Sequence, residues 1–362
     1  MRVDEVLALE QYGIAQERKD ALMRERLLEL TEHHRAACPP YARILAATGY
    51  DPAAASTIAD VPTLPIGLFK THRLSSVPDD EVFKVVTSSG TTGSQVSRIM
   101  LDRAAAVQQT QALASIMKHW LGDARLPMIV VDAKATLRNR GAPSARSAGI
   151  VGMATFGRDL LYVLDDDMAL RRDALHEWLG RHAGAPILLF GFTFMVWRYF
   201  VGALAPGEVD LSGGVLVHSG GWKKLADEAV DDAAFRATLA DLTGLRRVHN
   251  FYGMAEQIGT VFVQCEAGEL HAPNAADVIV RDPRTWAPAP VGDVGVVQVL
   301  SMLPESYPGH SILTEDLGRI TAVDTCPCGR LGKALRIEGR VPKAELRGCS
   351  DTHREIPAAA AA

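Results

Sequence analysis

The chain has 362 residues, of which 48% are hydrophobic and 22% are charged, and its formal net charge is −5. These values are typical of a soluble globular protein with a large core, and the length suits one large domain or two ordinary ones. Because no long basic tract occurs, the composition indicates neither a nucleic acid nor an anionic membrane as partner. The N-terminus is unlike a signal peptide, and no apolar run approaches the ~20 residues of a membrane span. We therefore expect a cytoplasmic protein.

The chain begins with a predicted helical region, residues 1–80. Leucines recur near helical spacing, as at Leu27 and Leu30, and Pro39 ends this helix. An irregular, loop-rich connection follows over 50–75.

A β hairpin is predicted directly after this region. The segment "VFKVV" reads as one strand and "QVSRIMLD" as a second, and between them lies the loop "SSGTTGS". Because this loop joins two strands, it does not have the strand-to-helix setting of a Walker phosphate loop.

Helices and apolar strands then alternate up to about residue 253. Strands such as "LPMIVVDA" and "APILLFG" separate the predicted helices 103–122, 169–183, 193–204 and 223–243. Such alternation indicates crossover connections and a largely parallel, buried sheet. Short strands with Gly and Pro turns predict a β-rich subdomain over 259–338. We therefore expect an α/β fold, with a core of mixed sheets and packed helices over 81–338 and a short tail over 339–362.

The loop "SSGTTGS" has the composition of a phosphate-binding loop. Its glycines allow the backbone to approach a ligand closely, and its amides and hydroxyls can donate to an anion. No lysine follows the second glycine, so the Walker pattern is excluded. A flexible hairpin turn is the alternative interpretation.

Two later segments carry further candidate side chains. In "NFYGMAEQ", Tyr252 could stack on a planar base and Glu256 could hold Mg²⁺, which prefers carboxylate oxygens. In "TEDLGRI", Asp316 could accept hydrogen bonds from two ribose hydroxyls. For "NFYGMAEQ" the alternative is a strand-to-helix turn with a core tyrosine. For "TEDLGRI" the alternative is an ordinary acidic turn.

Occurring in this order, the three segments resemble the adenylate-forming superfamily of acyl-CoA ligases, nonribosomal adenylation domains and luciferases. The resemblance implies that Tyr252 stacks on the adenine of ATP, Glu256 binds Mg²⁺ and Asp316 binds the ribose. The segment "EGRVPKAELRG" resembles the hinge of that superfamily and implies a hinge position for Arg340. The implied phosphate-loop residues are Ser88, Ser89, Gly90, Thr91, Thr92 and Gly93.

One branch of the superfamily is similar over almost the whole chain. The segments "VPTLPIGLFK", "SSGTTGSQVSRIMLD", "HSGGWKKL" and "RGCSD" resemble the acyl-protein synthetase of the bacterial luciferase fatty-acid reductase complex. This resemblance implies that a carboxylic acid is activated as acyl-AMP and then passed to a thiol, with Cys349 as the matching cysteine. A carrier protein, a reductase partner or coenzyme A are the other acceptors. A free, exposed cysteine is the alternative interpretation of Cys349.

The sequence departs from the superfamily at several points. Ala255 stands where a threonine usually precedes the glutamate. The mobile C-terminal domain with its catalytic lysine is expected to be largely absent, since only 22 residues follow Arg340. We therefore hypothesise that Lys223 or Lys224 supplies a cation near the carboxylate and the α-phosphate. The alternative is that both lysines lie at a helix start and face water.

The acyl pocket is expected beside the "HSGGW" segment and the helix that follows "APILLFGF". The candidate lining residues are Phe192, Phe194, Trp197, Gly220, Gly221 and Trp222, and the aromatic ones could equally belong to the core. These residue types do not discriminate an alkyl from an aryl acid.

Four residues of the β-rich subdomain form a candidate metal site. Cys265 with His271, and Cys326 with Cys328, supply three thiols and one imidazole, the ligand set of a closed zinc site. The same segments resemble phenylacetate-CoA ligases, some of which hold zinc there. Because both spacings differ from the common C-x₂-C pattern, three free thiols and a surface histidine are the alternative.

The sequence thus predicts an ATP-dependent, carboxylate-activating ligase of the acyl-protein synthetase type. ATP and Mg²⁺ are the expected cofactors, with a structural Zn²⁺ if the four metal-site residues meet. An acyl- or aryl-CoA ligase and a catalytically impaired scaffold subunit are the alternative functions.

Overall fold

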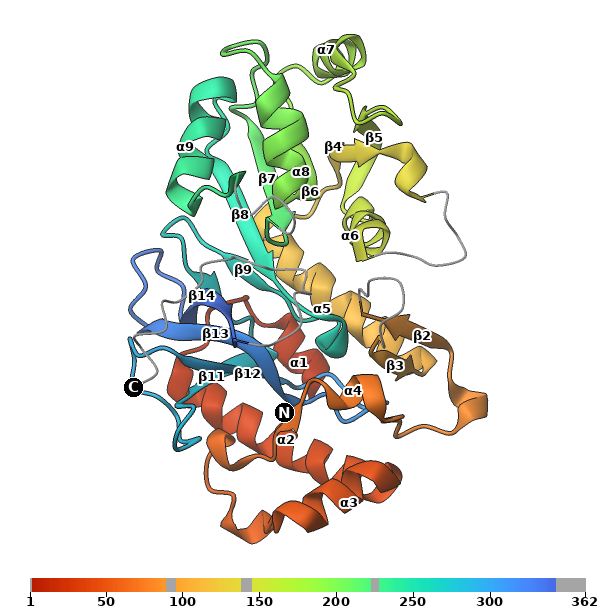
Figure 1. The fold of residues 1–362 in the computed structure, drawn as a ribbon, viewed down its shortest axis with the longest axis vertical. Helices are drawn as coiled ribbons and strands as arrows, with labels where there is room; N and C mark the ends of the chain where they lie inside the picture. Colours follow the sequence, from red (N-terminus) through yellow and green to blue (C-terminus); the bar gives the residue numbers. More distant parts are fainter. Residues whose placement is uncertain (1, 89–95, 138–144, 223–227, 343–362) are drawn as a thin grey trace. The chain divides into compact units, whose positions relative to one another are not determined.

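A computed structural model describes residues 2–88, 96–137, 145–222 and 228–342 (Figure 1). The chain divides into two compact units. Among the described residues, the first unit comprises 2–119 and 253–342, and the second comprises 120–252. The boundaries expected at residues 80, 259 and 338 are not those of this division and stay predictions.

The second unit is built on a parallel sheet with the strand order β8-β7-β6-β4-β5. Strands β4 and β6 are buried along their whole length, as is typical of a parallel sheet covered on both faces. Its elements are β4 (Leu126–Ala133), η4 (Lys134–Leu137), α6 (Ala145–Ala154), β5 (Gly157–Leu164), α7 (Arg172–Arg181), β6 (Ile187–Phe192), α8 (Thr193–Met195), η5 (Val196–Phe200), η6 (Val201–Ala203), β7 (Gly214–Ser219), α9 (Asp232–Thr243) and β8 (Arg247–Tyr252).

The predicted alternation of helices and strands is therefore confirmed, but α6 and β5 were missed. Among the strands that the structure describes, β5 pairs only with β4, and it has exposed positions at Arg158 and Asp159. Its pattern consequently lacks the continuous apolar run by which the central strands are recognised.

The first unit contains an antiparallel sheet with the order β11-β12-β13-β14-β10-β9, and β1 is added in parallel to β13. The β-rich subdomain expected after residue 259 is confirmed. The strands are β1 (Leu64–Pro65), β9 (Phe262–Gln264), β10 (Leu270–His271), β11 (Ala276–Arg281), β12 (Gly295–Ser301), β13 (Ser311–Val323) and β14 (Lys333–Arg340).

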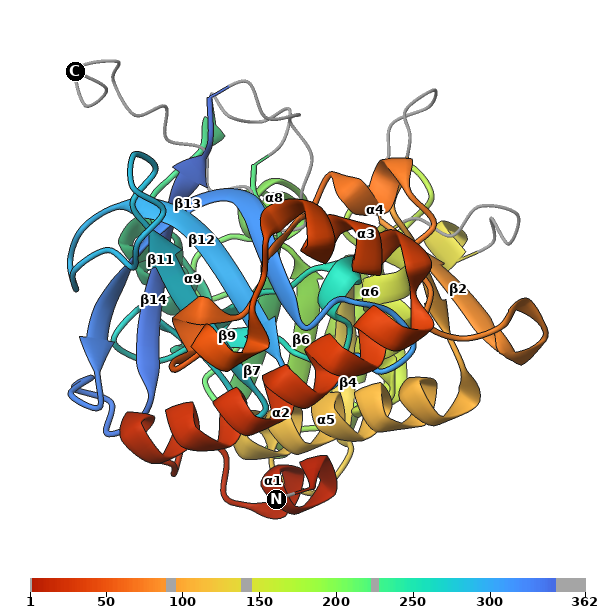
Figure 2. The same cartoon turned by 90° about the horizontal axis from the view of Figure 1, so that it is seen from below.

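Helices of the first unit pack against this sheet (Figure 2). Met23 and Leu27 of α2 and Ala112 of α5 share a buried cluster with Ile279 and Leu300 of the strands. Helix α2 ends at Ala37, as expected from the prolines that follow. The remaining elements are α1 (Val3–Ala8), α2 (Gln16–Ala37), α3 (Pro39–Thr48), η1 (Pro52–Ala54), η2 (Ile58–Asp60), α4 (Leu68–Thr71), η3 (Asp79–Glu81), β2 (Lys84–Thr87), β3 (Arg98–Leu101), α5 (Arg103–Leu121) and η8 (Ala255–Gln257).

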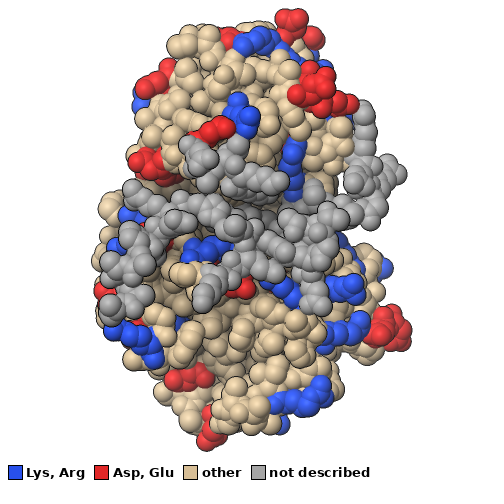
Figure 3. Space-filling model, in the orientation of Figure 1, with Lys and Arg blue, Asp and Glu red and all other residues tan. Residues whose placement is uncertain are grey.

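The surface carries both signs of charge. On the face drawn in Figure 3, basic and acidic side chains are interspersed in each unit. Within the described ranges, no helix has the length and apolarity that crossing a membrane requires.

Candidate active site and metal centre

The hairpin of β2 and β3 frames the predicted phosphate loop. Thr87 is paired with Arg98, and the Ser88 amide donates to the Ser97 carbonyl at 3.2 Å. The Ser97 amide donates in turn to Ser88 Oγ at 3.0 Å. The expected setting between two strands is thus confirmed, with Ser88 and Ser97 at the base of the loop. The other predicted loop residues, Ser89, Gly90, Thr91, Thr92 and Gly93, lie outside the described residues.

Glu256 is a buried carboxylate in the short helix η8, with 4% of its surface exposed. Burial raises the pKa of Glu256, because desolvation disfavours the charged form. The nearby Ser97 hydroxyl and, to a smaller extent, the charge on Lys70 lower this pKa. The predicted magnesium ligand therefore lies beside a residue of the loop base.

The segment that carries Glu256 is fixed against the turn before β13. The Gln257 side-chain amide donates to the carbonyls of Val299 and Gly309 at 3.0 and 2.9 Å. A methyl group on Gly309 would lie 2.2 Å from the Tyr307 ring and 2.8 Å from the Glu256 carbonyl oxygen. Only glycine therefore permits this close approach of the two segments.

Asp316 and Arg340 lie directly opposite each other on β13 and β14. Arg340 Nη2 is 3.0 Å from Glu315 Oε2, and Arg340 Nε is 3.3 Å from Asp316 Oδ1. The predicted ribose ligand and the predicted hinge arginine thus form an ion pair. Asp316 thus lies beside a cation, and its carboxylate oxygens are of the type that accepts hydroxyl hydrogen bonds.

The candidate residues of the second unit lie at or after the carboxyl ends of its parallel strands. Phe192 ends β6, Tyr252 ends β8, and the buried Gly220, Gly221 and Trp222 follow β7. This edge of a parallel sheet is where ligands commonly bind.

These aromatic side chains are closely packed. The Trp222 ring meets Trp197 edge-on, with the ring centroids 5.8 Å apart. Phe192 lies near Phe190, and its ring would be 3.3 Å from a methyl group on Gly149 of α6. Both are thus part of the packing of their own unit, and their predicted place in an acyl pocket stays a prediction. Lys223, with Lys224, lies outside the described residues.

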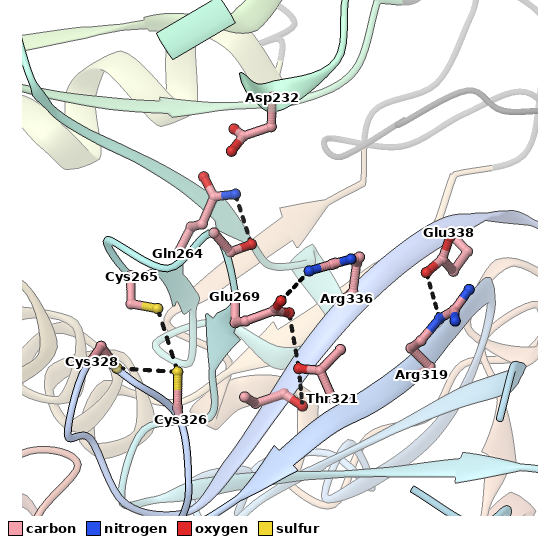
Figure 4. Close-up of polar contacts among 12 residues, drawn as sticks. Asp232, Gln264, Cys265, Glu269, Arg319, Thr321, Cys326, Cys328, Arg336 and Glu338 are labelled. Atoms are coloured by element: carbon pink, nitrogen blue, oxygen red, sulfur yellow. Dashed lines mark hydrogen bonds and ion pairs between the residues drawn. The ribbon is translucent and has the colours of Figure 1, made fainter. Parts of the chain in front are cut away.

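The four predicted metal ligands are brought together in the first unit. Their donor atoms all lie within 4.8 Å of one another. Cys326 Sγ is 3.9 Å from Cys265 Sγ and 3.4 Å from Cys328 Sγ, as Figure 4 shows. Cys328 Sγ is 3.3 Å from His271 Nε2. With Zn–S bonds of about 2.3 Å, tetrahedral ligand atoms lie roughly 3.8 Å apart, so the cluster fits a zinc ion.

Local turns and ion pairs position this cluster. The Cys265 amide donates to the Glu269 carbonyl at 2.8 Å, which closes the hairpin between β9 and β10. Glu269 is itself paired with Arg336 and accepts from Thr321 Oγ1 at 2.9 Å (Figure 4). The Gly329 amide donates to the Cys326 carbonyl at 2.9 Å and completes a turn around Cys328.

Three residues near Glu256 were not predicted from the sequence: Lys70, Ser97 and Tyr307. Lys70 ends the segment "VPTLPIGLFK", which carries part of the family resemblance. The sequence feature that could have indicated Lys70 is a lysine at the end of an apolar, proline-rich connection. Tyr307 carried no such signal, because its place beside Glu256 depends on packing.

Comparison with known proteins identifies the family. The family model "Acyl-protein synthetase, LuxE" matches residues 2–356. The chain belongs to the acyl-protein synthetase family. The predicted activity class is thus confirmed: an ATP-dependent ligase that activates a carboxylic acid and passes the acyl group to a thiol.

Two relatives of this acyl-protein synthetase are named long-chain-fatty-acid–luciferin-component ligases. That of Aliivibrio fischeri is 24% identical over 308 residues, which is 81% of this chain and 78% of the relative. That of Vibrio harveyi is 23% identical over 303 residues, covering 80% and 76%.

The fold of the acyl-protein synthetase is also found in solved structures. The crystal structure of 2-hydroxyisobutyryl-CoA ligase in the postadenylation state, in complex with 2-HIB-AMP, matches with a TM-score of 0.68 and 18% identity. The match covers 91% of this chain and 69% of that one. The expected fold class, an α/β core of mixed sheets and packed helices, is confirmed by this likeness.

Proposed function

We propose that this acyl-protein synthetase activates a long-chain aliphatic acid with ATP and Mg²⁺ in the cytoplasm. The observation that carries the proposed site is the buried Glu256 beside Ser97, at the base of the predicted phosphate loop. The aliphatic acid is proposed from the two relatives, which are named for long-chain fatty acids.

The first half-reaction forms a mixed anhydride. A carboxylate oxygen attacks the α-phosphorus of ATP, the bond to the β-phosphate bridging oxygen breaks, and pyrophosphate leaves. The loop residues 88–93 would donate to the phosphates, Asp316 would hold the ribose and Tyr252 would stack on adenine. Glu256 would hold Mg²⁺, which neutralises phosphate charge when bound. Lys223 is the proposed cation at the α-phosphate, and Arg340 the proposed hinge residue.

The second half-reaction transfers the acyl group. A thiolate attacks the acyl carbon, AMP leaves, and the thiol proton passes to solvent. We propose Cys349 as the acceptor within the chain. A carrier protein, a reductase partner or coenzyme A would then receive or replace this thioester. Gly220, Gly221, Trp222 and Phe192 are the proposed neighbours of the acyl chain.

Pyrophosphate release with a panel of acids tests the activation step. We expect release with long aliphatic acids and little with aryl acids. Release with no acid in the panel would contradict the proposed function.

Intact-protein mass spectrometry after incubation with ATP and acid tests the acceptor, since an acyl adduct lost in Cys349→Ser supports transfer within the chain. An adduct that persists in Cys349→Ser would assign the acceptor to another residue.

We also propose that Cys265, His271, Cys326 and Cys328 hold a structural zinc ion. All four donors are used, so the site has no open position for chemistry. It would join the hairpin of β9 and β10 to the loop between β13 and β14. Metal analysis of the purified protein should give one zinc per chain, lost in Cys326→Ser. Cys38→Ser is the matched control, since Cys38 is a buried thiol outside the cluster and should keep the zinc.

A further inference from the structure

Lys70 lies on a short helix that the fold attaches to the strand carrying Asp316. Strand β1 pairs in parallel with the start of β13, with Leu64 opposite Ile312. The Ile66 amide then donates to the Leu313 carbonyl at 2.9 Å. Helix α4 begins two residues later, so its position relative to β13 is set by backbone hydrogen bonds.

A continuous set of contacts joins α4 to Glu256. Phe69 is buried and meets the Tyr307 ring edge-on, with the ring centroids 6.2 Å apart. Tyr307 is fully buried, and Gly309 is the position where any side chain would strike both that ring and the Glu256 carbonyl. Phe69, Tyr307 and Gly309 thus place helix α4 in the same packed region as the segment that carries Glu256.

The charge on Lys70 acts on this carboxylate. It lowers the pKa of Glu256, whereas the charge on Glu315 raises it. Glu315 is paired with Arg340 at 3.0 Å. Lys70, Glu256 and the Glu315–Arg340 pair are therefore electrostatic neighbours within the first unit.

Helix α4 has anchors other than the Lys70 side chain. The helix is anchored by the Phe69 ring and by backbone bonds, among them the His72 amide to the Leu68 carbonyl at 2.8 Å. The Lys70 side chain is half-buried. An ammonium group on a rigid support, next to a buried carboxylate, is preorganised to bind an anion.

We propose that the Lys70 ammonium binds the phosphates of ATP beside Glu256 and stabilises the charge that develops when the carboxylate attacks the α-phosphorus. This inference rests on the proposed function. Lys70 would act in addition to Lys223, the cation proposed at the α-phosphate. Lys70 forms no covalent bond in this step, and pyrophosphate leaves as in the first half-reaction.

The test compares Lys70→Met with Lys70→Arg and with Lys118→Ala, an exposed lysine of α5. We expect kcat for acid-dependent pyrophosphate release to fall about 100-fold in Lys70→Met, as for removal of a preorganised donor. Lys70→Arg should retain at least a tenth of the activity, and Lys118→Ala should equal the wild type.

Equilibrium binding of a non-hydrolysable ATP analogue, with and without Mg²⁺, provides a readout other than turnover. We expect at least tenfold weaker binding in Lys70→Met with an unchanged Tm. Wild-type kcat and analogue affinity in Lys70→Met would overturn the proposal. An equal loss of Tm in the Met and Arg variants would also overturn it, because it would show a structural role. If the wild type released no pyrophosphate, the proposed function would fail, while analogue binding would still decide the role of Lys70.

Discussion

The buried carboxylate of Glu256 is costly to ionise, yet it is the proposed Mg²⁺ ligand. Its carboxylate is buried beside Ser97 and Tyr307, and desolvation raises its pKa. Such a group is expensive to ionise unless a cation compensates for the lost hydration. A bound metal ion and the ammonium of Lys70 are the compensating charges that we propose.

Glu256→Gln should therefore separate stability from activity. We expect about 100-fold slower pyrophosphate release, because the proposed Mg²⁺ ligand loses its charge. In metal-free buffer the folded wild type keeps the Glu256 proton at pH values where the unfolded chain has lost it. Wild-type stability should thus fall as pH rises above about 4.3, relative to the variant. Urea unfolding of both proteins over a pH series measures this difference, and parallel curves would contradict it.

Two buried histidines of the first unit, His34 and His310, should control its acid stability. Their rings are stacked with centroids 5.1 Å apart, and His310 Nε2 lies 3.0 Å from Thr31 Oγ1. Burial lowers the pKa of His310 to about 3 and that of His34 well below its usual range. Both rings therefore stay neutral in the folded protein where the unfolded chain takes up protons.

Stability should accordingly be lost as pH falls from about 6.5 towards 3, by up to ~1.4 kcal/mol per pH unit for each histidine. His310→Gln should remove one histidine's share of this slope, as measured by chemical unfolding between pH 4 and 7. His72→Gln is the control, because His72 is exposed. Equal slopes in the wild type and His310→Gln would show that His310 is not responsible.

At the scale of elements, a buried ion pair within the antiparallel sheet, together with hydrogen bonds from α2, attaches that helix to the sheet. Asp277 of β11 is fully buried and accepts from Lys333 Nζ at 2.9 Å and from Gln16 Nε2 at 2.8 Å. Lys19, one turn along α2, donates to the Ala272 carbonyl at 3.1 Å. Desolvation lowers the pKa of Lys19 to about 8, although the charge on Asp277 opposes this shift.

Removal of one partner should leave a buried charge uncompensated. We expect Asp277→Ala to lower the free energy of unfolding by about 3–5 kcal/mol. Glu177→Ala is the matched control on the surface, where Glu177 pairs with Arg181 at 2.9 Å, and it should cost less than about 0.5 kcal/mol. Urea denaturation measures both, and similar values for the two variants would refute the buried-pair argument.

At the scale of the molecule, all four proposed zinc ligands belong to one unit. The zinc would connect β10 with the loop after β13, segments that are otherwise distant in sequence. The parallel sheet of the second unit contributes no ligand to this cluster. Loss of the zinc ion should therefore destabilise the first unit more than the second.

Chelation should increase hydrogen exchange in residues 262–281 and 311–340 and leave β6 and β7 of the second unit unchanged. It should also lower the Tm of the first unit, because zinc binding contributes directly to folding. Hydrogen-exchange mass spectrometry with and without chelator measures both units in one sample. Cys328→Ser without chelator should reproduce the pattern, and uniform exchange across both units would contradict it.

The amino-acid sequence by itself determined the local features of this protein and their order. The hairpin around "SSGTTGS", the alternation that builds the parallel sheet, and the β-rich segment after residue 259 follow from periodicity and turn residues, which act over short stretches of chain. The same order of segments predicted the family. The edge strand β5 was missed, because its exposed positions interrupt the apolar pattern.

Only the tertiary structure decided which distant residues meet. Cys265 and Cys326 are 61 positions apart and come together because β10 and β14 are paired. Helix α4 meets the segment before β13 because Phe69 packs on Tyr307, a contact that no spacing encodes. Trp222 is packed against Trp197, where the sequence left core and pocket equally open. Strand register and side-chain packing fix such proximities, and both depend on the whole folded chain rather than on any one segment.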